Sequence, residues 1–154
     1  LEAMAWACKQ YHECFLEAGD ADIAREYISQ RGIDAASLEK FQIGFAPGQW
    51  SWLLDRGVAH GFSADVLEEA GLLTKNERGN RYDRFRARVL FPICDAQGKP
   101  IAIGGRILPG SAEQAKYINC NATRIYHQSH QLYGLNVARD AIVKSRVAVV
   151  MEGY

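Results

Sequence analysis

Apolar residues recur at helical spacing through the first eighteen positions of the chain. Cys8, Tyr11 and Phe15 are three or four residues apart, the repeat that places side chains on one face of a helix. The pattern predicts a helix over residues 1–18, which Gly19 would end because glycine readily adopts the left-handed conformation found after helices.

Several shorter helices are predicted between there and residue 70. Asp20, Asp34 and Ser63 each precede an apolar-periodic stretch, where their side chains can accept hydrogen bonds from free N–H groups at a helix start. The predicted helices cover residues 21–30, 34–40, 50–56 and 63–70.

The pattern then changes to β-branched runs. Residues 89–94 and 100–104 are separated by Asp95-Ala-Gln-Gly98, a turn sequence that predicts a β-hairpin. Residues 116–119 are expected to add a further short strand.

Near the C-terminus, a helix is predicted over residues 131–144, followed by the apolar run 147–151. An apolar strand after a helix is typical of a parallel strand buried on both faces. The predicted fold class is therefore α+β: a helical N-terminal part, a small sheet containing a β-hairpin, and the first buried strand of an α/β unit at the C-terminus.

Composition is that of a globular protein, with 48% hydrophobic and 23% charged residues, enough apolar material for a core. Lys+Arg and Asp+Glu are both 18, so a net charge of zero argues against a uniformly basic nucleic-acid binder. The distribution of charge does not argue against nucleic-acid binding, because acidic residues dominate residues 1–77 and arginines gather after them. A local basic face binds phosphate even on a neutral chain.

The densest group of arginines lies just before the hairpin. If this segment is extended, Arg84, Arg86 and Arg88 share one face and Phe85 points the other way. Guanidinium groups bind phosphate oxygens in pairs, so the pattern indicates phosphate binding. The alternative is a solvated strand face laced with salt bridges.

Two further segments carry weaker signals of the same kind. Gly104-Gly105-Arg106 allows close approach of a backbone or ligand, or is a simple β-bulge with an exposed arginine. Lys116, Tyr117 and Asn119 combine a cation, an aromatic ring and an amide, which suits single-stranded nucleic acid but also occurs on ordinary edge strands.

Glu152 directly follows the last apolar run, where α/β sheets place active-site residues, although a turn or cap residue would look the same. The four cysteines form no C-x-x-C pair, which argues against zinc and against a disulfide framework. Without a signal peptide or long apolar run, the chain is expected to be intracellular, with no membrane partner.

Taken in order, these segments resemble the bacterial DnaG-type primase family over residues 24–154. The matching segments are Tyr27-Ile-Ser-Gln-Arg-Gly32, Phe41-Gln-Ile-Gly-Phe-Ala-Pro47, Ala70-Gly-Leu-Leu73, residues 82–93, Gly104-Gly-Arg106, Lys116-Tyr-Ile-Asn119, Gln131-Leu-Tyr-Gly-Leu135 and Val150-Met-Glu-Gly-Tyr154.

The resemblance implies a DNA primase that makes short RNA primers on single-stranded DNA. Residues 1–143 would be the N-terminal subdomain of its catalytic core, and residues 144–154 the start of a Toprim domain. The positions that match the family's groove for template and RNA–DNA hybrid are Arg31, Arg84, Arg86, Arg106, Lys116, Tyr117 and Asn119.

Glu152 matches the first Toprim carboxylate, which implies a catalytic and metal-binding role with Mg²⁺ or Mn²⁺. No Asp-x-Asp set follows Glu152 in this sequence, and one carboxylate cannot hold two metal ions, so the chain alone is expected to be inactive. The resemblance also implies a Zn²⁺-binding module upstream of the matched region.

The implied partners are single-stranded template, RNA–DNA hybrid, ribonucleotides, the replicative helicase and single-strand-binding protein, in the bacterial cytoplasm at the nucleoid. Gln128 and His130 stand where the family usually has Lys and Arg, and Cys120-Asn121 replaces Ser-Pro, so a phage-like or helicase-fused relative stays open. Two other functions also stay open: a scaffold that docks on Toprim without touching nucleic acid, and a Toprim nuclease or topoisomerase.

Overall fold

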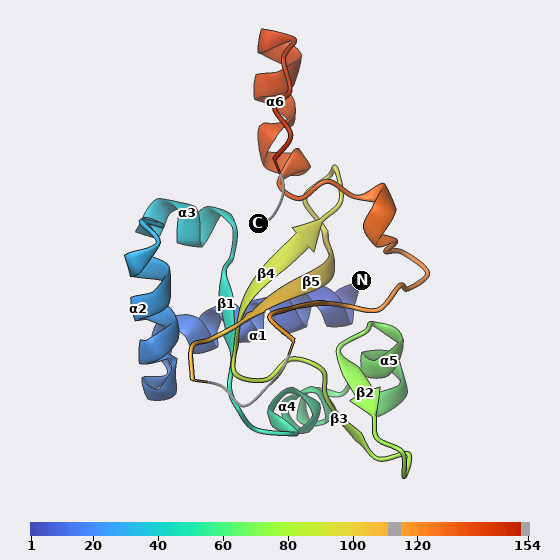
Figure 1. Ribbon diagram of the computed structural model, residues 1–154. Helices are drawn as coiled ribbons and strands as arrows, with labels where there is room; N and C mark the ends of the chain where they lie inside the picture. Colours follow the sequence, from blue (N-terminus) through green and yellow to red (C-terminus); the bar gives the residue numbers. More distant parts are fainter. Residues whose placement is uncertain (111–114, 152–154) are drawn as a thin grey trace.

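A computed structural model of the chain describes residues 1–110 and 115–151. Helices dominate the first half, and the second half supplies three of the four strands of an antiparallel sheet (Figure 1), so the predicted α+β class is confirmed. The helices are α1 (Glu2–Glu17), η1 (Gly19–Ala21), α2 (Asp22–Gln30), α3 (Ala35–Lys40), α4 (Trp52–His60), α5 (Ala64–Glu69), η2 (Gln128–His130) and α6 (Leu135–Ser145). The strands are β1 (Gly44–Ala46), β2 (Leu73–Lys75), β3 (Arg81–Asp83), β4 (Arg88–Cys94), β5 (Pro100–Ile107) and β6 (Tyr117–Asn119).

The predicted hairpin forms the centre of the main sheet, whose strand order is β1-β4-β5-β6. Its turn is built as the sequence indicates. The Asp95 carboxylate accepts the backbone N–H groups of Gln97 and Lys99 at 3.0 and 2.9 Å, and Gly98 has φ +83°, a conformation that glycine adopts without steric cost. The predicted strand over 116–119 pairs with β5 as β6.

Helix α1 packs against the main sheet and lies behind it in Figure 1. Its periodic face is buried as predicted, with Tyr11 and Phe15 each 1% exposed. Gly44 is needed at the contact, because a Cβ there would lie 2.8 Å from the Cβ of Tyr11. The absent side chain therefore lets β1 lie directly against the helix.

Two of the three predicted caps are confirmed. The side chains of Asp34 and Ser63 accept the N–H groups of Ser37 and Val66, at the starts of α3 and α5. The prediction for Asp20 is wrong: this residue lies inside η1, and α2 begins without a side-chain cap.

Three short strands were not predicted. Strands β1, β2 and β3 have three residues each, too few for the alternation of apolar and polar residues to become visible. Their existence depends on pairing, β1 with β4 and β2 with β3.

The C-terminal part differs most from expectation. The predicted helix starts later, as α6, after Gly134, and projects from the rest of the chain (Figure 1). The predicted buried strand over 147–151 does not form: Val147 and Val149 are 62% and 82% exposed. A strand needs a neighbour for its backbone hydrogen bonds, and no described strand pairs with this segment.

Candidate nucleic-acid interface

A row of alternating cationic and aromatic side chains runs from α2 to β6, and we call it the arginine–tyrosine row. The Arg31 guanidinium lies 5.0 Å from the centre of the Tyr27 ring, and Arg106 lies 5.4 Å from the same ring. Arg106 also lies 4.8 Å from the Tyr117 ring, which Lys116 approaches at 5.9 Å. Four of the seven predicted nucleic-acid-binding residues are thus brought together. Tyr27, which was not among the predicted residues, lies between them.

Backbone geometry explains why the row forms. Arg31 follows the last turn of α2 and lies four residues after Tyr27, a spacing that brings side chains together on a helix. Arg106 on β5 is directly opposite Tyr117 on β6 in the antiparallel register, so the two side chains are cross-strand neighbours.

The cations of the row, Arg31, Arg106 and Lys116, form no ion pair with a carboxylate among the residues that the structure describes. Aromatic faces offset part of their mutual repulsion, and an anion would relieve it further. The arrangement is suited to phosphate.

Arg84 and Asn119 are also brought together, though through the backbone. The Arg84 Nε donates to the Asn119 carbonyl oxygen at 2.9 Å. This contact joins the segment after β3 to β6, the strand that carries Tyr117.

Arg86 lies in a second aromatic group, formed by Trp50 and Tyr82. Its guanidinium is 4.1 Å from the Trp50 ring and 5.1 Å from the Tyr82 ring, and it donates to the Asp83 carbonyl at 2.6 Å. The indole of Trp50 is 62% exposed. Sequence reasoning missed both aromatic residues, although Tyr82 stands inside the arginine-rich segment.

The predicted shared face of three arginines is wrong. Residues 84–87 form no strand and the chain bends at Arg84 and Ala87; the φ of +48° at Ala87 breaks the alternation of side chains. Arg88 is 1% exposed, and its guanidinium donates to the Lys116 carbonyl at 3.5 Å. Phe85 and Arg88 are both buried, so Arg88 does not share an exposed face with Arg84 and Arg86.

Gly105 serves packing and not a ligand. A Cβ at this position would lie 2.9 Å from Phe85 Cδ1 and 3.2 Å from Arg88 Cδ. The close approach that the paired glycines predict therefore occurs, and at Gly105 the approaching groups are the side chains of Phe85, Leu90 and Arg88.

Asp83 is a buried carboxylate beneath this surface. Its two oxygens accept the N–H groups of Leu53 and Leu54 at 2.6 and 3.0 Å, so a residue of β3 caps the start of α4. Burial raises the pKa of the Asp83 carboxyl to about 6, although the two N–H groups and Arg86 favour the charged form.

The remaining predicted site residue, Glu152, lies outside the described residues. Within those residues, no group of three or more His, Cys, Asp or Glu side chains could hold a metal ion. None of the helices there is long and apolar enough to cross a membrane.

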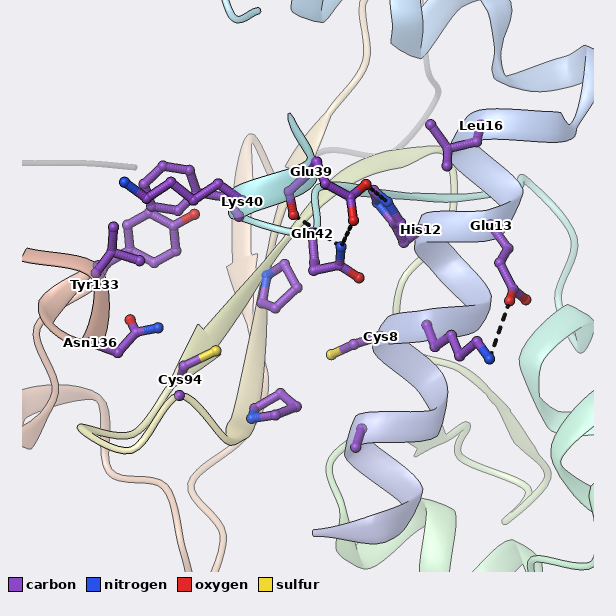
Figure 2. A pocket seen from close by; sticks show the side chains of 18 residues that line it. Cys8, His12, Glu13, Leu16, Glu39, Lys40, Gln42, Cys94, Tyr133 and Asn136 are labelled. Carbon is purple, nitrogen blue, oxygen red and sulfur yellow. Dashed lines mark hydrogen bonds and ion pairs between the residues drawn. The ribbon is translucent and has the colours of Figure 1, made fainter. Parts of the chain in front are cut away.

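A pocket of about 540 Å³ lies elsewhere, between α1, the turn after α3, the β4–β5 hairpin and the start of α6 (Figure 2). His12 lies at its wall, with Nδ1 2.8 Å from the Ile43 carbonyl oxygen and Nε2 3.2 Å from Glu39 Oε2. Gln42 donates to the other Glu39 oxygen at 3.1 Å. These groups fasten α1 to the turn after α3, and no residue of the arginine–tyrosine row lines the pocket.

The chain is similar to known proteins of one family. Residues 11–139 match the family described as DNA primase catalytic core, N-terminal domain. The DNA primase of Salmonella typhimurium is 42% identical over 131 residues, which cover 85% of this chain and 22% of that protein. The chain thus spans about a fifth of this relative's length.

Two solved structures share the fold. The RNA polymerase domain of Mycobacterium tuberculosis primase DnaG, in complex with a double-stranded DNA oligomer with a 6-nucleotide overhang, has a TM-score of 0.92 at 37% identity. The match covers 99% of this chain and 47% of that one. A DnaG primase catalytic domain bound to ssDNA has a TM-score of 0.82 at 37% identity, covering 91% of this chain and 44% of that one.

The α+β fold and the family match over residues 11–139 define the class as a primase catalytic-core domain. The chain belongs to the family of bacterial DnaG-type DNA primases, within the N-terminal domain of the catalytic core.

Proposed function

We propose that the chain is the template-handling part of a DNA primase, a DNA-directed RNA polymerase that synthesises short RNA primers on single-stranded DNA. The observation that carries the proposal is the arginine–tyrosine row. Its three cations contact aromatic rings, and they form no ion pair with a carboxylate among the described residues. Support also comes from the relatives, two of which are described as complexes with DNA.

The chemistry of the row matches a single strand. Guanidinium groups bind phosphate oxygens bidentately and without regard to base sequence. Tyr117 is 48% exposed, so its ring offers a surface on which a base can stack. The same groups can hold the backbone of an RNA–DNA hybrid, which we include as a ligand of this surface.

The reaction itself would need more than this chain supplies. Nucleotidyl transfer uses two divalent ions that several carboxylates hold together, and we infer Mg²⁺ or Mn²⁺ as the metals of the whole protein and Glu152 as one ligand. The described residues hold no carboxylate cluster that fits such ions. We therefore expect no primer synthesis by this chain alone.

Residues 144–154 are proposed as the first segment of the Toprim domain. In its support, four apolar residues of this segment are exposed, as expected of a surface that packs against a further domain: Val147, Val149, Val150 and Met151. Ribonucleotides, a replicative helicase and single-strand-binding protein are the partners that we propose for the whole protein, together with an upstream zinc module.

The test is binding of an oligothymidylate strand as a function of salt concentration. Arg31→Ala combined with Arg106→Ala should weaken binding and reduce the slope of log K against log salt, by about 0.7 for each phosphate that is no longer neutralised. Arg84 and Arg86 suit this test less well, because both also hold backbone carbonyls.

The matched control is Arg78→Ala combined with Lys99→Ala, two exposed residues of the hairpin turns. This pair changes the net charge equally but leaves the row intact, so affinity and salt slope should stay close to those of the unaltered chain. Equal behaviour of the two double variants would overturn the proposed function and favour a scaffold that does not bind nucleic acid.

A further inference from the structure

Tyr27 occupies an unusual position in the arginine–tyrosine row. Arg31 comes from the end of α2 and Arg106 from β5, two elements far apart in sequence, and both guanidiniums lie against this one ring at 5.0 and 5.4 Å. The two cations are thus neighbours in space because of a shared aromatic partner.

The ring is anchored by the core. Tyr27 packs against the buried cluster that includes Ile28 of α2 and Val89 of β4. Val89 is paired with Arg106 in the sheet, so the same packing that fixes the ring also fixes the strand that carries Arg106. A rigid ring between two long, flexible side chains restricts where their charged ends can go.

The hydroxyl group of Tyr27 does not explain why a tyrosine stands at this position. Its oxygen is buried and has no hydrogen-bond partner among the described residues. Since a buried, unbonded hydroxyl opposes folding, the contribution of Tyr27 lies in its ring face. Tyr117 differs, because its ring is half exposed.

We propose that Tyr27 is a positioning residue, whose ring sets the spacing of Arg31 and Arg106 so that both bind phosphates of one nucleic-acid strand. Each guanidinium is attracted by the negative face of the ring, which offsets the repulsion between the two cations before a strand arrives. The proposal rests on the proposed function, since it concerns the same surface.

The experiment compares Tyr27→Phe with Tyr27→Leu in the full chain, using the oligothymidylate strand as the probe. Phenylalanine keeps the ring and should bind within about twofold of the unaltered chain. Leucine keeps the apolar packing but removes the ring, and should weaken binding about five- to thirtyfold, the sum expected for two exposed cation–π contacts. Circular dichroism verifies that each variant is folded.

A double-mutant cycle separates positioning from mere packing. In the background of Arg31→Ala and Arg106→Ala, Tyr27→Leu should have no further effect on affinity, because no guanidinium is left to position. An unchanged penalty in that background would overturn the proposal and make Tyr27 an ordinary packing residue. Loss of binding in Tyr27→Phe would overturn it as well, since the hydroxyl would then be the active group.

The two hypotheses fail in different ways. If the arginine double variant binds normally, the proposed function fails. If that variant binds weakly while Tyr27→Leu binds like the unaltered chain, only the role of Tyr27 is refuted. Should Tyr27→Leu not fold, Tyr27→Met replaces it as a ringless apolar variant, and Tyr27→Phe still tests the proposal alone.

Discussion

Two regions of this molecule use basic side chains in opposite ways. Around β2, β3 and α5, Arg81 and Lys75 are neutralised by Glu68, and Arg81 also by Asp65. In the arginine–tyrosine row, Arg31 and Arg106 have aromatic partners. The first arrangement joins a hairpin to a helix, and the second is the one that we propose binds phosphate. Residue type alone does not distinguish them.

The largest expected effect lies in the first region, at Asp83. Asp83→Ala should lower the free energy of unfolding by about 2–4 kcal/mol, because two N–H groups at the start of α4 lose their acceptor. Urea unfolding measures it. If the loss of stability is no larger than that of Asp140→Ala, at an exposed aspartate, then Asp83 does not cap α4.

The pH dependence of stability sharpens the same point. The pKa of Asp83 is about 6 in the folded protein and near 3.8 when unfolded, so the folded state binds the proton more tightly. Proton binding at Asp83 therefore contributes about 2–3 kcal/mol to the free energy of unfolding. This contribution is fully present below pH 3.8 and is lost as pH rises through 6.

Asp83→Asn cannot ionise and should lack this decline. Unfolding free energies at a series of pH values from 4 to 7 provide the comparison, and parallel curves for the two proteins would contradict the raised pKa.

Within the second region, Gly105→Ala tests whether packing beneath the row is tight. The new Cβ would lie 2.9 Å from Phe85, and overpacking of this kind costs about 1–3 kcal/mol. Thermal unfolding gives the loss. Gly48→Ala is the control, because a Cβ there meets nothing within 4 Å; equal stability of the two variants would show that Phe85 yields freely.

The smallest effects contrast the two regions directly. Arg106→Ala should reduce oligothymidylate affinity severalfold and leave stability nearly unchanged, whereas Arg81→Ala should slightly reduce stability and leave affinity unchanged. Binding curves measure the change in affinity of each variant, and melting curves measure the change in stability. Loss of affinity in Arg81→Ala would mean that carboxylate pairing does not remove an arginine from ligand binding.

Much of the fold follows from local pattern. The face of α1, the caps at Asp34 and Ser63 and the turn from Asp95 to Gly98 depend on neighbours in sequence, and all were predictable. Strands of three residues were not, because their formation depends on a partner strand.

The candidate site was predictable only in part. Arg31, Arg106, Lys116 and Tyr117 do lie together. The prediction that Arg84, Arg86 and Arg88 share one face is wrong, because the positive φ of Ala87 turns the chain. The binding roles assigned to these residues and to Asn119, and the catalytic role assigned to Glu152, all stay predictions.

The sequence by itself determined the α-helices of the N-terminal part and the β4–β5 hairpin, because capping, periodicity and turn chemistry act over a few residues. It also determined the family, through an ordered set of motifs. Only the tertiary structure decided which cations are neutralised and which are not. That outcome depends on side chains from distant segments, such as Tyr27 beside Arg106 and Asp65 beside Arg81, since charge and aromatic contacts act over a few ångströms of space whatever the separation along the chain.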